Sequence, residues 1–170
     1  MLTLITMRHA KSGWDDPGIE DRDRPLSDRG RRDAPRIGQW LHNAAPLPDL
    51  ILCSSAQRTL ETAQAVTGQL DGAPEPIPRD DLYMARSDRL LSVLRAATGG
   101  TVMVIAHNGG IGDFAARMVR DAPEHERFTD YPTAATCVME FDAETWAEVR
   151  PGTGRVTGFV VPGDLEGVVG

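Results

Sequence analysis

The sequence has few of the features that mark secreted, membrane or nucleic-acid-binding proteins. Only two cysteines are present, Cys53 and Cys137, so neither a disulfide framework nor a zinc cluster is expected. No apolar run approaches the ~18 residues of a spanning helix, and the first ten residues lack the basic start and cleavage site of a signal peptide. With 18 Lys and Arg against 25 Asp and Glu, the chain lacks the basic surface that nucleic-acid binding requires. We therefore expect a cytoplasmic protein with no membrane or nucleic-acid partner.

The composition that remains is that of an ordinary globular protein. The chain has 170 residues, of which 41% are hydrophobic and 25% are charged. No internal repeat or linker divides it, so residues 1–170 are expected to form one domain. Because the net charge is −7, an anionic substrate would need a local cationic pocket.

Short apolar runs alternate with segments of helical spacing. The runs that predict strands are Leu2–Met7, Asp49–Cys53, Thr101–Ala106, Ala135–Phe141 and Val156–Val161, the last of them at a sheet edge. A first helix is predicted from a cap at Ser27, with a kink or restart at Pro35, and a second over 55–70 behind a capping box of Ser54 and Gln57. A third is predicted from a cap at Ser87 to Gly99-Gly100, and a fourth over Gly110–Arg120. The alternation predicts an α/β fold, a three-layer α/β/α sandwich around a mostly parallel central sheet.

Polar residues follow three of the predicted strands. Arg8 and His9 follow the first, Ser54 to Arg58 follow the second, and His107 and Asn108 follow Thr101–Ala106. Sheets of this kind bind ligands beyond the carboxyl ends of their strands, so these side chains should meet in one crevice. Residues 10–26 are polar and contain several glycines and prolines, which indicates a loop long enough to act as a lid.

Two histidines and two arginines at such an edge suit phosphoryl transfer. Arginine holds a pair of phosphate oxygens with its planar fork, and a neutral imidazole can attack phosphorus and carry a phosphoryl group. The transition state is loose, so positioning and charge neutralisation do most of the work. Arg58 also lies in the first turn of a predicted helix, whose free N–H groups favour anions. We therefore expect chemistry that needs neither a metal nor another cofactor.

Three segments resemble a known family. LITMRHAKS, LCSSAQRTLETA and VIAHN are similar to the signature segments of the histidine phosphatase superfamily, which includes phosphoglycerate mutases and acid phosphatases. RHAKS followed by DRPLSDRG resembles its small SixA-like phosphohistidine phosphatases, although Ala10 stands where the Arg-His-Gly motif has glycine. The resemblance covers roughly residues 1–145 and implies a phosphoglycerate mutase-like fold.

The resemblance also implies roles for individual residues. His9 would be the nucleophile, Arg8 and Arg58 the phosphate clamp, and His107 a fourth pocket residue that stabilises the transferring group. Arg24 lies in a similar Arg-Pro-Leu loop and is predicted to bind phosphate, as are Ser12 and Asn108 by adjacency. To attack, His9 must keep one ring nitrogen unprotonated while a hydrogen bond, expected from a backbone carbonyl, holds the other.

One departure from the family bears on the substrate. Mutase-like members have an acid shortly after the leucine of the segment that here reads DDLYMA, and Met84 stands in its place. An alcohol leaving group needs such an acid, whereas a protonated phosphohistidine leaves as neutral imidazole. The expected substrate is therefore phosphohistidine on a protein. Other carboxyls could still supply the proton: Asp80, Asp81, Asp15 or Asp16.

Two alternatives stay open: a small-molecule phosphomonoesterase of the same superfamily, and a phosphate-binding module that kept the clamp and lost turnover. The remaining chemistry-bearing residues are expected to be structural. Cys53 forms C-x4-R with Arg58, one residue short of a cysteine phosphatase loop, and is interpreted as a core thiol. Surface or packing roles are expected for His42, His125, Trp14 and the acidic run Asp15, Asp16, Glu20, Asp21 and Asp23, and the tail from Arg150 is expected to carry no chemistry.

Overall fold

The computed structural model describes residues 1–13 and 16–166. Its strands are β1 (Leu2–Arg8), β2 (Leu50–Ser54), β3 (Ile77–Arg79), β4 (Thr101–Ala106), β5 (Thr136–Phe141) and β6 (Arg155–Val160). Its helices are α1 (Asp28–Ala44), α2 (Gln57–Thr67), α3 (Ser87–Arg95), α4 (Gly110–Met118) and α5 (Pro162–Leu165). Three 3-10 turns are also present: η1 (Asp21–Asp23), η2 (Asp80–Leu82) and η3 (Trp146–Glu148).

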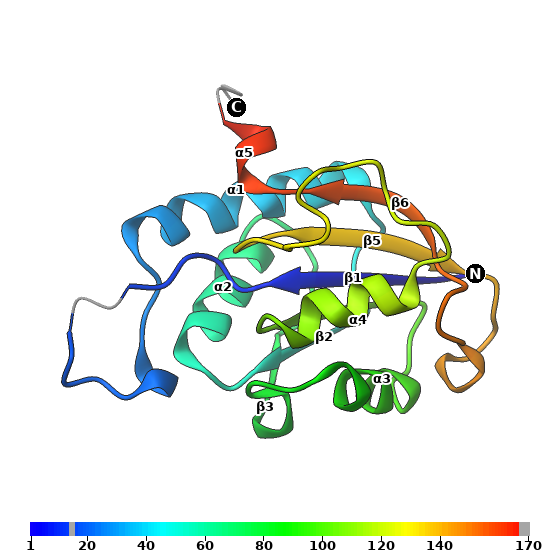
Figure 1. Cartoon of the computed structure of the whole chain (residues 1–170), viewed down its shortest axis with the longest axis horizontal. Helices are drawn as coiled ribbons and strands as arrows, with labels where there is room; N and C mark the ends of the chain where they lie inside the picture. Colours follow the sequence, from blue (N-terminus) through cyan, green and yellow to red (C-terminus); the bar gives the residue numbers. More distant parts are fainter. Residues whose placement is uncertain (14–15, 167–170) are drawn as a thin grey trace.

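The strands form one six-stranded sheet in the order β3-β2-β4-β1-β5-β6 (Figure 1). The four strands from β3 to β1 are parallel, while β5 runs antiparallel to β1 and β6 antiparallel to β5. The mostly parallel sheet and the edge position of the last strand are as predicted. In this order β1, β4 and β2 are neighbours, so their carboxyl ends share one edge of the sheet.

Helices cover both faces of the sheet. Side chains alternate along a strand, so Leu4 of β1 packs into the cluster that contains the buried residues of α3 and α4. Ile5 and Met7 belong to the opposite cluster, with the buried residues of α1 and α2. The predicted three-layer arrangement is therefore confirmed. Within the described residues, no helix is both long enough and apolar enough to cross a membrane.

Helix α1 departs from its prediction in one respect. Ser27 caps it as expected, since its hydroxyl accepts a hydrogen bond from the N–H of Gly30 at 3.2 Å. However, Pro35 does not restart the helix, which runs without interruption from Asp28 to Ala44. Proline removes one backbone donor, but the buried face formed by Ala34, Ile37 and their neighbours keeps the helix continuous.

Two predicted helix caps are wrong. Helix α2 begins after Ala56 without a side-chain cap, because the Ser54 hydroxyl is turned into the site described below. Helix α3 begins at Ser87 itself, after Arg86, and ends at Arg95, four residues before the left-handed Gly99.

The short strand β3 was missed in the proline-rich segment before Arg79. Proline cannot donate to a strand ladder, which argues against a central strand. The structure accommodates Pro78 because β3 lies at the edge of the sheet and pairs only with β2.

Candidate active site

The carboxyl ends of β1, β2 and β4 meet at one pocket of about 310 Å³. Figure 1 shows the loop after β1 leaving the sheet at this end. All seven predicted site residues line the pocket: Arg8, His9, Ser12, Arg24, Arg58, His107 and Asn108. Four further residues line it among those that the structure describes: Lys11, Asp21, Met84 and Thr133. The structure therefore brings together all the side chains that were predicted to take part in catalysis or to bind phosphate.

His9 lies on the pocket floor with only 7% of its surface exposed. Its Nδ1 is 2.7 Å from the backbone oxygen of Ala10, and because a carbonyl only accepts, Nδ1 carries the proton. This leaves the lone pair on Nε2, as the predicted backbone hydrogen bond requires. Burial, assisted by the positive charges of Arg58 and Arg8, lowers the pKa of His9 to about 4. At neutral pH His9 is therefore an uncharged imidazole with one nitrogen available for attack.

His107 is held at both ring nitrogens. Nη2 of Arg58 lies 3.3 Å from Nδ1, and because guanidinium only donates, Nδ1 must accept. Nε2 then carries the proton and donates to the Ser54 hydroxyl at 2.8 Å. Burial, with smaller effects of His9 and Arg58, lowers the pKa of His107 to about 3. Its ring meets that of His9 edge-on, with centroids 5.4 Å apart.

Two guanidinium groups of the pocket have unused donors. Arg58 is 2% exposed and Arg8 is half-buried, with Nη1 of Arg8 donating to the backbone oxygen of Tyr131 at 3.1 Å. The Nε atoms of both arginines are buried, and neither has a hydrogen-bond partner among residues 1–13 and 16–166. Buried polar groups are normally satisfied, and a phosphate oxygen is the partner that arginine binds best. These donors fit the predicted phosphate clamp.

Asp21 was predicted to lie on a solvated acidic face, and this is wrong. Its Oδ2 accepts hydrogen bonds from Nη2 of Arg58 at 3.1 Å and from the hydroxyl of Tyr83, and its Oδ1 accepts from Nε of Arg24 at 3.1 Å. The Tyr83 hydrogen bond and, to a smaller extent, Arg58 lower the pKa of Asp21 to about 2. The one signal in the sequence was the i,i+3 spacing of Asp21 and Arg24, which allows a local ion pair.

The three residues predicted by analogy or adjacency sit on the rim and are held by the protein itself. Arg24 is 8% exposed, and its Nη1 donates to the Ser12 hydroxyl at 3.0 Å. The Asn108 amide donates to the backbone oxygen of Asp130 at 3.1 Å and accepts from the N–H of Gly112 at 3.2 Å. Asn108 thus links the strand end to α4, and phosphate contact by these three side chains stays a prediction.

The carboxyls considered as proton donors do not line the pocket where the structure describes them. Asp80 pairs with Arg22 at 2.7 Å, and Asp81 pairs with Arg79 at 2.7 Å. Hydrogen bonds from Ser55 and then Arg22 lower the pKa of Asp80, and the hydrogen bond from Arg79 lowers the pKa of Asp81. Asp16 accepts a hydrogen bond from the N–H of Gly18 at 2.9 Å in its own loop. Asp15 and Trp14 lie outside the described residues.

Cys53, His42 and His125 were expected to be structural, and none of the three lines the pocket. Cys53 is fully buried, and burial raises the pKa of its thiol to about 11. His42 is exposed near the end of α1, and Nε2 of His125 lies 2.9 Å from a carboxylate oxygen of Asp164. Among the described residues, no three His, Cys, Asp or Glu side chains lie close enough together to hold a metal ion.

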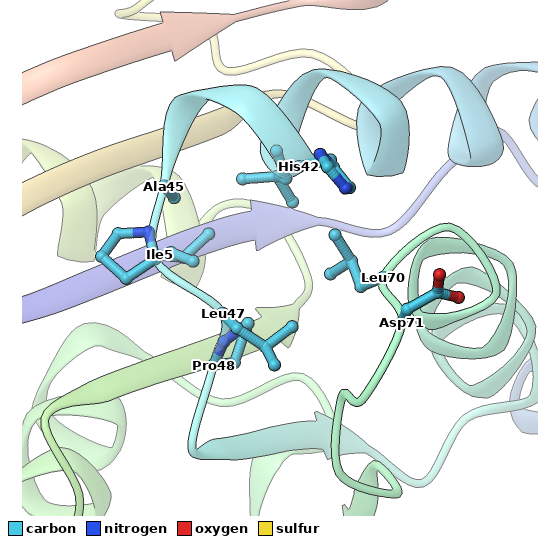
Figure 2. A pocket seen from close by; sticks show the side chains of 9 residues that line it. Ile5, His42, Ala45, Leu47, Pro48, Leu70 and Asp71 are labelled. Carbon is cyan, nitrogen blue, oxygen red and sulfur yellow. The ribbon is translucent and has the colours of Figure 1, made fainter.

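A second pocket, of about 160 Å³, lies between the carboxyl ends of α1 and α2 (Figure 2). Its wall is mostly apolar, with Ile5, Leu47 and Leu70 among its side chains, and His42 and Asp71 are the titratable residues among the described part of its lining. It has no lysine or arginine among its described lining residues. It therefore offers no fixed positive charge to an anionic substrate, unlike the pocket at the strand ends.

Comparison with known proteins gives a family match over the first half of the chain. A model of the histidine phosphatase superfamily (branch 1) matches residues 4–83, which include β1, β2 and α2. An uncharacterized protein of Mycobacterium tuberculosis is 36% identical over 163 residues, covering 92% of this chain and 99% of the relative.

Two solved structures match nearly the whole chain. Both are provisionally named as phosphohistidine phosphatase SixA, and both are 28% identical to this chain. The one from Nakamurella multipartitia covers 95% of this chain and 96% of its own, with a TM-score of 0.79. The one from Agrobacterium tumefaciens covers 95% and 98%, with a TM-score of 0.77. These matches confirm the predicted fold.

Proposed function

Because the chain belongs to the histidine phosphatase superfamily, in its SixA-like branch, and is a phosphatase, we propose that it hydrolyses phosphohistidine on a protein through a phosphoryl intermediate on His9. The observation that carries this proposal is the state of His9. It is an uncharged imidazole whose free Nε2 lies in a pocket rich in guanidinium groups. We further propose that residues 1–170 act as one domain, and that the protein works in the cytoplasm.

In the first step Nε2 of His9 attacks the phosphorus of the substrate. The electron pair of the breaking P–N bond moves to the substrate ring, whose other nitrogen keeps its proton, so the ring departs as neutral imidazole. Arg8 and Arg58 bind the non-bridging oxygens and offset their charge. His107, held between Ser54 and Arg58, fixes the position of the Arg58 guanidinium.

In the second step a water oxygen attacks the phosphorus of phospho-His9. The P–N bond pair returns to Nε2, and the water's two protons leave with the product as dihydrogen phosphate. The proton stays on Nδ1 throughout, hydrogen-bonded to the Ala10 carbonyl, so His9 also departs as a neutral imidazole and is ready for another cycle. The cycle therefore needs no net proton transfer to a protein side chain.

The residues at and near the pocket mouth support this substrate class. Met84 is 54% exposed and lines the pocket, and a thioether cannot protonate an alcohol. Asp80 and Asp81 are engaged with arginines outside the pocket. A phosphate monoester would thus lack the acid that its alkoxide requires, while a protonated phosphohistidine would not need one.

The test compares hydrolysis of a phosphohistidine peptide and of p-nitrophenyl phosphate by the native chain and by His9→Ala, with EDTA in every assay. We expect kcat/KM to be higher for the phosphohistidine peptide, and at least ~10³-fold lower in His9→Ala, since the variant lacks the nucleophile. Brief incubation with labelled substrate should leave an acid-labile phosphoryl group on the native chain and none on the variant.

Other outcomes would replace the proposal. Preference for p-nitrophenyl phosphate would indicate a small-molecule phosphatase of the same superfamily. Binding of inorganic phosphate without turnover of either substrate would indicate a phosphate-binding module. Loss of activity with EDTA, restored by a divalent cation, would contradict the metal-independent mechanism.

A further inference from the structure

We propose that Asp21 determines substrate specificity: its carboxylate accepts a hydrogen bond from the protonated distal ring nitrogen of phosphohistidine, and so favours this substrate over phosphate monoesters. The inference rests on the proposed function and names the residue that selects its substrate class. It assigns a task to the loop between β1 and α1, which supplies Asp21 to the pocket.

Asp21 lies on the side of the pocket from which a leaving group departs. In-line displacement places the leaving nitrogen on the far side of the phosphorus from His9. His9 is 7% exposed on the floor, whereas the side chain of Asp21 is 42% exposed and Met84 is 54% exposed. The leaving group therefore departs from the pocket floor toward the pocket mouth, where Asp21 and Met84 lie.

Arg58, one of the two clamp arginines, contacts the Asp21 carboxylate. Its Nη2 lies 3.1 Å from Oδ2 of Asp21, 3.3 Å from Nδ1 of His107 and 4.0 Å from Sδ of Met84. A phosphoryl group held by Arg58 is therefore next to Asp21 as well. A second groove, of about 480 Å³, shares Met84, His107 and Asn108 with the pocket and offers room for the rest of the substrate.

The carboxylate has capacity for one more donor. Oδ2 already accepts from Arg58 and from the Tyr83 hydroxyl, whereas Oδ1 accepts a hydrogen bond from Nε of Arg24 at 3.1 Å and also lies 3.1 Å from Nη2 of the same side chain. A carboxylate offers about four acceptor positions, and the exposure of this side chain leaves Oδ1 reachable from the mouth. The low pKa of Asp21, about 2, keeps this group ionised at every pH at which the enzyme would work.

Phosphohistidine and phosphate monoesters interact differently with the negative charge of Asp21. A phosphohistidine that leaves as neutral imidazole must carry a proton on its distal nitrogen, and a neighbouring carboxylate raises the pKa of that cation. The proton stays on the substrate ring, so Asp21 acts by charge and hydrogen bonding and accepts no proton. A phosphate monoester presents no N–H at this point, so it gains no hydrogen bond from the carboxylate. One carboxylate therefore favours the first class over the second.

The experiment measures kcat/KM of Asp21→Asn for the phosphohistidine peptide and for p-nitrophenyl phosphate between pH 5 and 9. We expect kcat/KM for the phosphohistidine peptide to fall about tenfold, which is the size of effect expected for loss of a hydrogen bond to a charged group. We expect kcat/KM for the monoester to stay equal or to rise. The alkaline limb of the phosphohistidine profile should move down by about one pH unit, because the substrate ring loses its proton earlier.

Controls separate charge from folding. Asp121→Asn removes one carboxylate from a surface pair with Arg120, outside the pocket, and should match the native chain. If Asp21→Asn unfolds, Asp21→Ser tests loss of the same carboxylate with a smaller side chain. Thermal unfolding of each variant shows whether it is folded.

The outcomes are distinct. Equal losses for both substrates without a shift of the alkaline limb would show that Asp21 only positions Arg58 and Arg24, and would overturn the inference. Unchanged kinetics in both Asp21 variants would overturn it too. If the native chain hydrolyses the monoester but not phosphohistidine, the proposed function itself fails, and the inference fails with it.

Discussion

At the scale of single residues, burial decides which form of each titratable side chain is present. His9 and His107 are both buried beside arginines, so both are uncharged at neutral pH, and the hydrogen bonds at their ring nitrogens fix opposite tautomers. His9 keeps its proton on Nδ1, whereas His107 keeps it on Nε2. The free Nε2 of His9 suits a nucleophile, whereas the accepting Nδ1 of His107 suits a support for Arg58.

We predict that the His9 ring titrates near pH 4 in the free enzyme. Burial disfavours the imidazolium, so the Nδ1–H tautomer should persist from neutral pH down to about pH 4. Nitrogen-15 NMR of the ring, assigned with His9→Gln, measures both the midpoint and the tautomer. A midpoint near 6.5, or a proton on Nε2 at pH 7, would contradict the mechanism.

We also predict that Cys53 is dispensable for turnover. Its thiol is fully buried with a pKa raised to about 11, so almost no thiolate exists at neutral pH. Cys53→Ala should retain kcat/KM within about twofold and lower the free energy of unfolding by roughly 1–2 kcal/mol through a small cavity. A large loss of kcat, with the fold intact, would reopen the thiol as nucleophile.

At the scale of elements, the site depends on how closely α4 approaches the segment before α3. Helix α4 begins at Gly110, directly after the strand end that carries His107. A Cβ built on Gly110 would lie 1.8 Å from the backbone oxygen of Ala85, which follows Met84. Only glycine permits this contact, which joins two walls of the pocket.

We predict that Gly110→Ala lowers both stability and activity. The added methyl must push α4 away from Ala85, which should reduce the free energy of unfolding by about 1–3 kcal/mol. The displaced wall should also reduce kcat/KM. Gly163→Ala is the matched control, because its added Cβ would meet nothing within 4 Å. Urea unfolding compares the two, and equal stabilities would show that the close approach is not needed.

At the scale of the whole molecule, a chain of net charge −7 concentrates positive charge in one pocket. Arg8, Arg24 and Arg58 surround His9 and lower its pKa, and the fold keeps the two pocket histidines uncharged beside them. The unfolded chain has no such constraint, because its histidines are solvated and titrate near pH 6.5. The site therefore links global stability to pH.

We predict that the protein loses stability as the pH falls below 6.5. Between that value and the lowered pKa values of His9 and His107, about 4 and 3, the unfolded state binds more protons than the folded state. Stability is thus fully present above pH 6.5 and declines through this window, on the order of 3 kcal/mol for His9 alone. Urea unfolding at pH 7 and pH 4.5 measures the loss. His9→Gln should lose less, and an equal loss would contradict this assignment.

Much of the site could be predicted from the sequence alone. Strand runs that end in Arg8-His9, Ser54 and His107 are local patterns, and parallel neighbours bring such ends to one sheet edge by simple geometry. The fold class, the cationic pocket and the buried Cys53 followed from these patterns. The errors at the local level were the helix caps, Pro35 and the missed edge strand β3, where tertiary packing overrides propensity.

Only the tertiary structure decided the place of Asp21, the task of Ser54 and the tautomer of His107. Asp21 meets Arg58 across 37 residues and Tyr83 across 62, and His107 meets Ser54 across 53. Hydrogen bonds at such separations depend on how the loop after β1 and the ends of β2 and β4 come together at the sheet edge, which no local pattern encodes. The sequence therefore determined which candidate groups gather at this edge, and the folded chain determined their protonation and their partners.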